Sequence, residues 1–175
     1  KSQAIVTEIR ILVGAGSFLP NYELVTRIGI NGIRKRIEAK LASLDMAMPG
    51  HYEKIVYLKA LLIVSEGVLT FARRYANLAK EKASQEKDVR RKTELEKIAG
   101  ICEQVPANPA RTFGEALQSL WLYHVCLWME HDATTYGPGR MDQYLYPFYR
   151  EDIDQGRLTR EEAQELLECL WVKFS

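Results

Sequence analysis

The residue types that could carry chemistry gather in the segment from His124 to Tyr149. His124 and His131 stand seven positions apart, and Glu130 and Asp132 flank the second of them. Positions seven apart share one face of a helix, but zinc sites usually take ligands three or four apart or from a Cys-x-x-Cys turn. The spacing therefore favours a core or capping histidine, and we assign no metal ligand.

The pair His131-Asp132 follows the end of a predicted helix and enters an irregular segment. A carboxylate beside an imidazole can act in general acid–base catalysis near neutral pH. A histidine at this position can equally stabilise the C-terminus of the helix through the helix dipole. The sequence leaves both interpretations open.

Three hydroxyl groups, those of Thr134, Thr135 and Tyr136, precede a Gly-Pro-Gly turn at 137–139. Such hydroxyls can orient a small polar substrate, or they can satisfy backbone groups of the turn. The spacing alone favours the second role.

The composition is that of an ordinary globular protein: 175 residues, 47% hydrophobic and 27% charged. The formal net charge of +1 argues against nucleic acid as the main partner. The longest uncharged apolar stretch, 119–129, is shorter than the roughly 20 residues of a membrane-spanning helix, so we expect no membrane partner. The three cysteines form no Cys-x-x-Cys pair, which indicates a reducing, cytoplasmic setting and small hydrophobic roles within helices.

The elements that position these groups are predicted to be mainly α-helical. Apolar residues recur at helical spacing over 22–44, where Gly29 and Gly32 indicate the close approach of another backbone. Thr112–Glu115 and Thr159–Glu162 fit capping boxes that open the last two long helices. The other predicted elements are helices at 51–83 and 86–105, short strands at 4–6 and 9–13, and a packed aromatic layer at 141–149.

The centre of the second predicted helix, Ala60–Val64, is apolar on every side, which predicts burial on every side. The chain has few other helices to cover it, and the last helix reaches Phe174 without a Gly or Asn stop signal. Both features lead us to expect a piece of a larger protein.

Two motifs resemble the glycyl radical enzyme family: Arg111–Gln118, and Gly137–Tyr149 with Glu130 ahead of it. The segment Asn21–Gly32 resembles the Asp-Tyr … Gly-x-Asn-Gly helix of that family, and Arg74–Ala76 resembles its Arg-Tyr-Ala. The resemblance covers nearly the whole chain. It is greatest to the branch that contains glycerol dehydratase, choline trimethylamine-lyase and pyruvate formate-lyase-like proteins.

The resemblance implies a fold in which helices wrap a ten-stranded α/β barrel. The fragment 1–175 would then be mainly α and part of the pyruvate formate-lyase-type catalytic domain. It would divide into a barrel or pocket loop at 1–21, helices at 22–130, a pocket loop and aromatic segment at 131–149, and a final helix at 150–175.

The resemblance also implies radical chemistry. The family uses a glycyl radical, installed by a partner S-adenosylmethionine iron–sulfur activase, and a thiyl cysteine. The Arg-Val-x-Gly and Gly-Cys motifs that carry them do not occur in this sequence. We therefore expect no catalytic residue and no bound cofactor in the fragment, and no activity of the fragment alone.

The substrate-binding positions implied by the resemblance are Ser17, Phe18, His131, Thr134 and Thr135. Thr134 and Thr135 stand where diol-dehydrating and choline-cleaving members have His and Ser, and Ser17 stands where they have a further His. Thr135 keeps a hydroxyl, and His131 offers a displaced imidazole. The loss of two imidazoles argues against glycerol and choline as substrates.

We therefore predict part of a cytoplasmic glycyl radical lyase of anaerobic metabolism, as a homodimer or homo-oligomer. It would cleave a C–C or C–X bond in a small organic substrate, by a lyase, dehydratase or decarboxylase reaction. The alternative is a non-catalytic helical structural or interaction module. A reading frame that continues into both radical motifs would distinguish the two.

Overall fold

Helices dominate the structure, a computed structural model that describes residues 17–130 and 135–174. In chain order the elements are β1 (Ser17–Phe18), α1 (Tyr22–Ala42), α2 (His51–Gln85), α3 (Val89–Gln104), α4 (Phe113–Glu130), β2 (Thr135–Tyr136), α5 (Met141–Tyr144), α6 (Tyr146–Asp154) and α7 (Arg160–Phe174). The prediction of a mainly helical fragment is confirmed for these residues. The strands predicted at 4–6 and 9–13 lie outside them.

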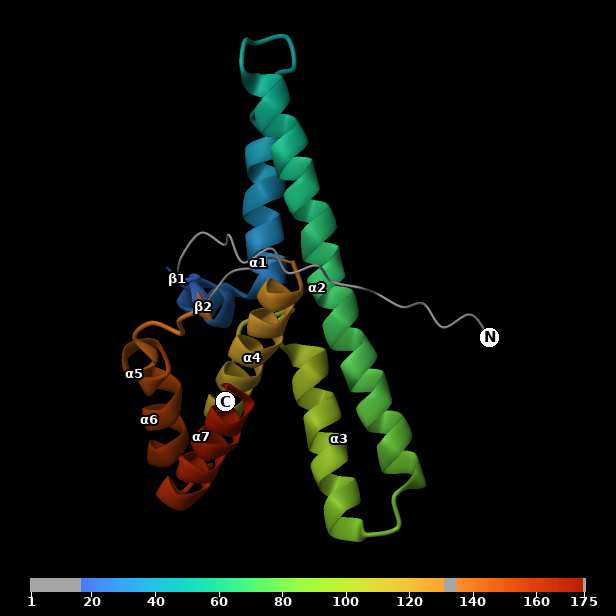
Figure 1. Cartoon of the computed structure of the whole chain (residues 1–175), viewed down its shortest axis with the longest axis vertical. Coiled ribbons are helices and arrows are strands. Elements are labelled where there is room, and N and C mark those ends of the chain that lie inside the picture. Colours follow the sequence, from blue (N-terminus) through green and yellow to red (C-terminus); the bar gives the residue numbers. More distant parts are fainter. Residues whose placement is uncertain (1–16, 131–134, 175) are drawn as a thin grey trace.

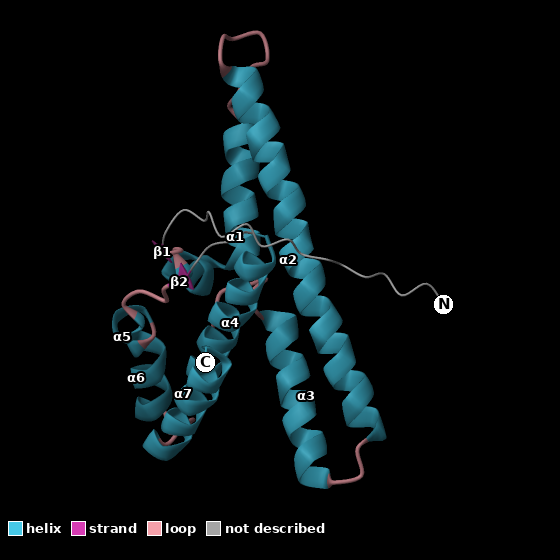
Figure 2. Cartoon of the chain, viewed as in Figure 1, coloured by secondary structure: helices cyan, strands magenta, loops and turns pink. Residues whose placement is uncertain are grey.

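The long helix α2 runs the length of the molecule (Figure 1). α1 packs along its first half and α3 along its second half, while α4 occupies the centre and contacts α1, α2 and α3. α7 packs against α4, and α6 also reaches α4 (Figure 2). The molecule therefore has a central junction around α4, from which the α2–α3 pair extends as an arm.

Helix α1 begins at an asparagine cap and changes direction at a glycine. The Asn21 side chain accepts a hydrogen bond from the amide of Leu24 at 2.9 Å. Gly29 has a φ of 66°, in the left-handed region that glycine adopts without the steric cost of a Cβ. The helix resumes after the kink, and Ile30 and Ile37 are buried at the helical spacing that the sequence shows over 22–44.

The loop between α3 and α4 fills the kink of α1. The amide of Ile30 donates to the carbonyl of Pro106 at 2.8 Å. A Cβ placed on Gly29 would lie 2.5 Å from the carbonyl carbon of Asn108, so the predicted close approach of another backbone is confirmed there. It is wrong for Gly32, where a Cβ would meet a side chain of the same helix at 2.9 Å.

Small side chains form the seam between α2 and α3. The buried residues of α2 in this region recur at spacings of four and three, which keeps them on one face of the helix. They are Ala72, Ala76, Ala79 and Ala83 on α2, opposite Leu95, Ala99 and Cys102 on α3. Because alanine adds little bulk, the two helix axes can approach closely.

The centre of α2 is exposed, at a segment for which the sequence predicted burial on every side and few helices in this chain to provide it. Ile63 is 74% exposed and Val64 is 48% exposed. The neighbours of α2 follow its length without encircling it, so this outward face has no helix against it within the described residues. Apolar composition alone did not reveal which faces the neighbouring helices cover.

Helix α2 is also long and apolar enough to cross a membrane, unlike any segment predicted above. An 18-residue window of it has a mean hydropathy of 1.8, and 11% of that window is buried. Glu66, near the middle of α2, pairs with Arg34 of α1 at 2.6 Å and with Arg73 at 2.7 Å. Because charged groups are costly in lipid, these ion pairs disfavour a membrane-spanning role.

The two predicted capping boxes differ in completeness. At the start of α4, the amide of Glu115 donates to Thr112 Oγ1 at 3.2 Å, but the Glu115 carboxylate accepts from the amide of Arg111 instead of that of Thr112. Before α7, Thr159 and Glu162 exchange both hydrogen bonds, at 2.8 and 3.1 Å. The second prediction is confirmed in full and the first in its threonine half.

The buried carboxylate of Asp152 joins α6 to the start of α4. It is 3% exposed and accepts a hydrogen bond from the amide of Phe113 at 2.7 Å. The guanidinium of Arg157 pairs with it at 2.7 Å. This contact fixes the predicted aromatic layer against the core, where Tyr149 meets Phe113 edge to face at a centroid distance of 5.7 Å.

Candidate substrate-binding site

The two segments predicted to bind substrate meet as neighbouring strands. β1 and β2 pair in parallel, with Ser17 opposite Thr135 and Phe18 opposite Tyr136. The amide of Gly137 donates to the carbonyl of Phe18 at 2.9 Å and extends the pairing. Parallel strands need a crossover to connect them, and here that crossover is the whole set of helices from α1 to α4.

Three of the five predicted substrate-binding residues lie in this strand pair: Ser17, Phe18 and Thr135. Phe18 is 39% exposed, and its ring centroid lies 6.1 Å from that of Tyr136. His131 and Thr134 lie outside the described residues. The pairing brings the first three positions together, and the role of all five in substrate binding stays a prediction.

The hydroxyl of Tyr136 has a structural partner. It donates to the carbonyl of Leu127 at the end of α4, at 3.2 Å. Burial raises the pKa of this phenol, which therefore stays protonated at neutral pH. The contact is to a backbone carbonyl of α4, whereas the sequence favoured backbone groups of the 137–139 turn as partners of these hydroxyls.

His124 is buried behind β2, where it is 5% exposed. Its Nδ1 lies 2.7 Å from the hydroxyl of Tyr22, and its Nε2 accepts a hydrogen bond from Trp128 Nε1 at 2.8 Å. Burial lowers the pKa of this imidazole. The interpretation of His124 as a core histidine is confirmed.

The sequence analysis missed the two partners of His124. The spacing of four between His124 and Trp128 on one helix was a usable signal, because such positions are neighbours on the helix surface. Tyr22 comes from a distant helix and left no such signal. Within residues 17–130 and 135–174, no group of three or more His, Cys, Asp or Glu residues is placed to hold a metal ion.

The cysteines do not fit a thiyl site. Cys102 is buried, and burial raises the pKa of the half-buried Cys126 thiol to about 11. Cys169 is exposed, which corrects its expected role as a small hydrophobic residue, because it lies on a face of α7 that no described residue covers. None of the three follows a glycine. These three cysteines therefore do not match the Gly-Cys pattern of the thiyl residue.

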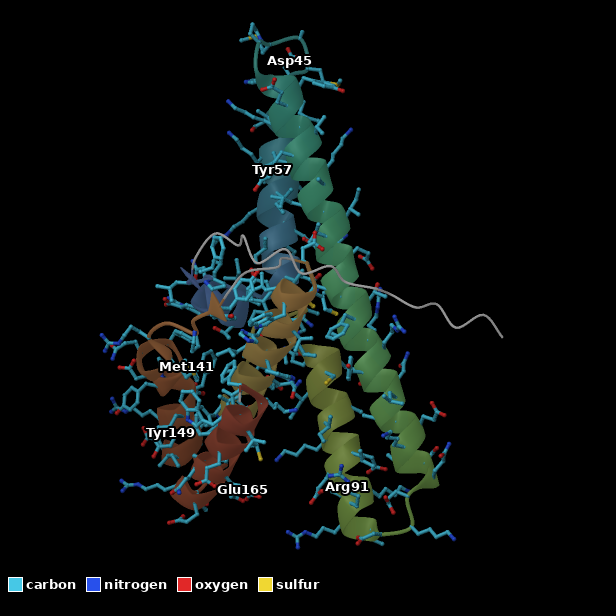
Figure 3. The ribbon with its side chains drawn as sticks, in the orientation of Figure 1. Asp45, Tyr57, Arg91, Met141, Tyr149 and Glu165 are labelled. Carbon is cyan, nitrogen blue, oxygen red and sulfur yellow. The ribbon has the colours of Figure 1, made fainter. Side chains whose placement is uncertain are left out.

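The fold and the strand pair together define a helical segment that places two sequence-distant strands side by side, next to an aromatic core. Figure 3 shows this junction well away from the tip of the α1–α2 pair, which Asp45 marks. The sequence matches the Pyruvate formate lyase-like family over residues 1–175. The chain belongs to this family of glycyl radical enzymes, as the sequence motifs predicted.

Similar proteins include lyases and dehydratases. The chain is 42% identical over 174 residues to the isethionate sulfite-lyase of Oleidesulfovibrio alaskensis, covering 98% of this chain and 21% of that protein. It is 40% identical over 157 residues to the trans-4-hydroxy-L-proline dehydratase of Clostridioides difficile, covering 87% of this chain and 20% of that protein.

A solved structure is also similar. The glycerol-bound form of the B12-independent glycerol dehydratase from Clostridium butyricum matches with a TM-score of 0.87 and 36% identity, over 91% of this chain and 20% of that one. The chain thus spans about a fifth of the length of these relatives.

Proposed function

We propose that this chain contributes part of the substrate site of a glycyl radical enzyme that cleaves a C–C or C–X bond in a small organic molecule. The observation that carries the proposal is the parallel pairing of β1 with β2. It joins, in register, two segments that the family resemblance independently assigned to the substrate.

The proposed site consists of Ser17, Phe18, His131, Thr134 and Thr135. Hydroxyl groups suit this role because they donate and accept hydrogen bonds and can orient a polar substrate. Phe18 adds apolar surface to the strand pair, where its ring faces that of Tyr136. His131 and Thr134 enter the proposal from the sequence alone.

The substrate class follows from the side chains at these positions. Hydroxyls at 17, 134 and 135 replace the imidazoles and the serine of diol-dehydrating members, so we propose a substrate other than glycerol or choline. Similar proteins carry names that include isethionate and trans-4-hydroxy-L-proline. Both compounds, with arylacetates, belong in the test panel.

The wider setting is proposed from the family. The radical glycine and the thiyl cysteine lie in parts of the protein outside these residues, and a radical S-adenosylmethionine activase installs the radical. The helices wrap the ten-stranded barrel of the family, and the protein works in the cytoplasm as a homodimer or homo-oligomer. The 175-residue chain alone is inactive.

The test is anaerobic activation of the whole protein, followed by product analysis with the panel and with glycerol and choline as comparisons. Thr135→Ala should lower kcat/KM about 10-fold or more, the scale of one lost substrate hydrogen bond, while the glycyl radical signal in electron paramagnetic resonance stays unchanged. Thr93→Ala, an exposed threonine on α3, is the matched control.

Equal kcat/KM in the two threonine variants would remove Thr135 from the site. A protein that forms the radical and converts no member of the panel would contradict the proposed substrate class. A protein that accepts no radical would favour the alternative of a non-catalytic helical module.

A further inference from the structure

The buried imidazole of His124 has a hydrogen-bond partner on each ring nitrogen. Trp128 Nε1 lies 2.8 Å from Nε2, and the Tyr22 hydroxyl lies 2.7 Å from Nδ1. An indole N–H can only donate, so Nε2 must be the acceptor and carries no proton. Neutral imidazole then has its proton on Nδ1, which donates to the Tyr22 oxygen.

This arrangement leaves no room for a second proton on the ring. A proton on Nε2 would point at the N–H of Trp128, and two donors would face each other in a buried site. His124 therefore does not exchange protons while Trp128 holds this position. Its two hydrogen bonds connect α1, through Tyr22, to the last turn of α4, through Trp128.

The ring of His124 also lies directly behind β2. Its centroid is 6.1 Å from that of Tyr136, edge to face, and the Trp128 ring is 5.4 Å from Tyr136. The ring of Phe174 in α7 also meets this imidazole edge to face, at a centroid distance of 4.9 Å. Tyr136 is in register with Phe18, so one layer of contacts separates His124 from the strand pair.

We infer that His124 is a positioning residue. By holding Tyr22 and Trp128 in one fixed arrangement behind Tyr136, it sets the place of β2 relative to α1, and so the place of the β1–β2 pair. Its effect on turnover rests on the proposed function, because only then is this strand pair part of a substrate site. Its effect on the strand pairing itself does not.

The first readout is hydrogen exchange of the peptide that contains Gly137, in the whole protein, because the Gly137 amide bonds the Phe18 carbonyl. His124→Ala should speed this exchange about 10-fold or more. His124→Gln should restore more of the protection than His124→Asn. Only the longer glutamine amide reaches the position of Nε2 and offers Trp128 an acceptor, whereas asparagine reaches only the position of Nδ1.

The second readout is steady-state kinetics after anaerobic activation. A displaced strand pair should raise KM by about 10-fold and lower kcat less, because the reacting groups lie elsewhere. The glycyl radical yield should not change. His51→Ala, a histidine at the N-terminus of α2 that bonds the Asp45 backbone, is the matched control.

Equal exchange at Gly137 in His124→Ala and His51→Ala would overturn the inference, and so would better protection in the asparagine variant than in the glutamine variant. If the exchange results are as expected and no compound of the panel is converted, the proposed substrate class fails while the positioning role of His124 stands.

Discussion

The junction around α4 and the arm formed by α2 and α3 are stabilised in different ways. In the junction, backbone amides of α1 bond carbonyls of a loop, and polar side chains such as His124 and Asp152 are buried with partners. In the arm, a seam of alanines lies between two helices whose outer faces are exposed and charged, as around Arg91 in Figure 3.

This contrast predicts which single substitutions should have large effects on stability. A group that fits against backbone cannot move aside, because the facing atoms belong to the main chain and its hydrogen bonds. A charged side chain on the arm has solvent as an alternative partner. We therefore expect large effects in the junction and small ones on the arm.

The largest effect should come from Gly29→Ala. The added Cβ would lie 2.5 Å from the backbone of Asn108, at a residue whose φ is positive. We expect a loss of about 3 kcal/mol or more in local stability, from overpacking together with backbone strain. Hydrogen exchange of the 105–110 loop measures it.

Gly67→Ala, within α2, is the matched control for Gly29. A Cβ on Gly67 would meet no atom within 4 Å, and alanine is the better helix former by up to about 1 kcal/mol. The change should therefore stay within about 1 kcal/mol. Similar losses in the two variants would show that the kink does not depend on close backbone contact.

The next effect should come from Asp152→Ala. The change leaves the Phe113 amide and the Arg157 guanidinium without their buried acceptor, which we expect to cost about 3 kcal/mol. Thermal unfolding measures it, with Asp154→Ala as control, because the Asp154–Arg150 pair is exposed and 3.5 Å long. Equal losses of stability in the Asp152→Ala and Asp154→Ala variants would mean that burial of the Asp152 carboxylate does not increase its contribution to stability.

Acidification should weaken the junction through His124. Because burial lowers its pKa below the ordinary value of about 6.5, the unfolded chain takes up the proton first, and stability falls as the pH drops below that value towards the lowered one. The slope is at most about 1.4 kcal/mol per pH unit. The facing phenols of Tyr22 and Tyr136 stay neutral in this range, because burial raises the pKa of each.

Hydrogen exchange of the Tyr136–Gly137 peptide between pH 7.5 and 5.5, corrected for the intrinsic pH dependence of exchange, measures this slope. His124→Gln should remove it, because glutamine does not titrate. A slope that persists in the glutamine variant would assign the acid sensitivity to another group.

The smallest effect should come from Lys80→Ala on the arm. Lys80 pairs with Glu103 across α2 and α3, and both side chains are about half exposed, at 54% and 51%. Exposed pairs contribute about 0.2–1 kcal/mol, and salt screens them. If thermal unfolding shows a loss of stability above about 2 kcal/mol, ion pairs stabilise the arm as strongly as close packing stabilises the junction.

The sequence predicted what is local and periodic. The helices, the capping box at Thr159 and the core position of His124 follow from spacing, and Gly29 signalled a close backbone contact before its partner was known. These features depend on neighbours within one or two helical turns, so a single segment contains the information.

The features that sequence could not supply depend on long-range contacts. No sequence pattern in 105–110 predicts that this loop fills the kink of α1. No pattern near Tyr22 predicts its hydrogen bond to His124. The exposure of Ile63 shows the same limit, because apolar composition does not say which neighbours exist. The sequence connected the segments of β1 and β2 only through the family resemblance, which assigned both of them to substrate binding.

The hydrogen bonds at the Gly29 kink have a mechanical consequence. Ile30 and Asn31 are tied by their amides to Pro106 and Ala107, and the Ala110 amide is tied to the Thr26 carbonyl, so the loop clamps α1 on both sides of the bend. Beyond the clamp, α1 continues from residue 32 to Ala42 over about 17 Å, at about 1.5 Å per residue. A rotation of about 10° at its base would sweep its tip through roughly 3 Å over that length. The short loop at 105–110 thus fixes the direction of the second half of α1 and of the part of α2 that packs against it.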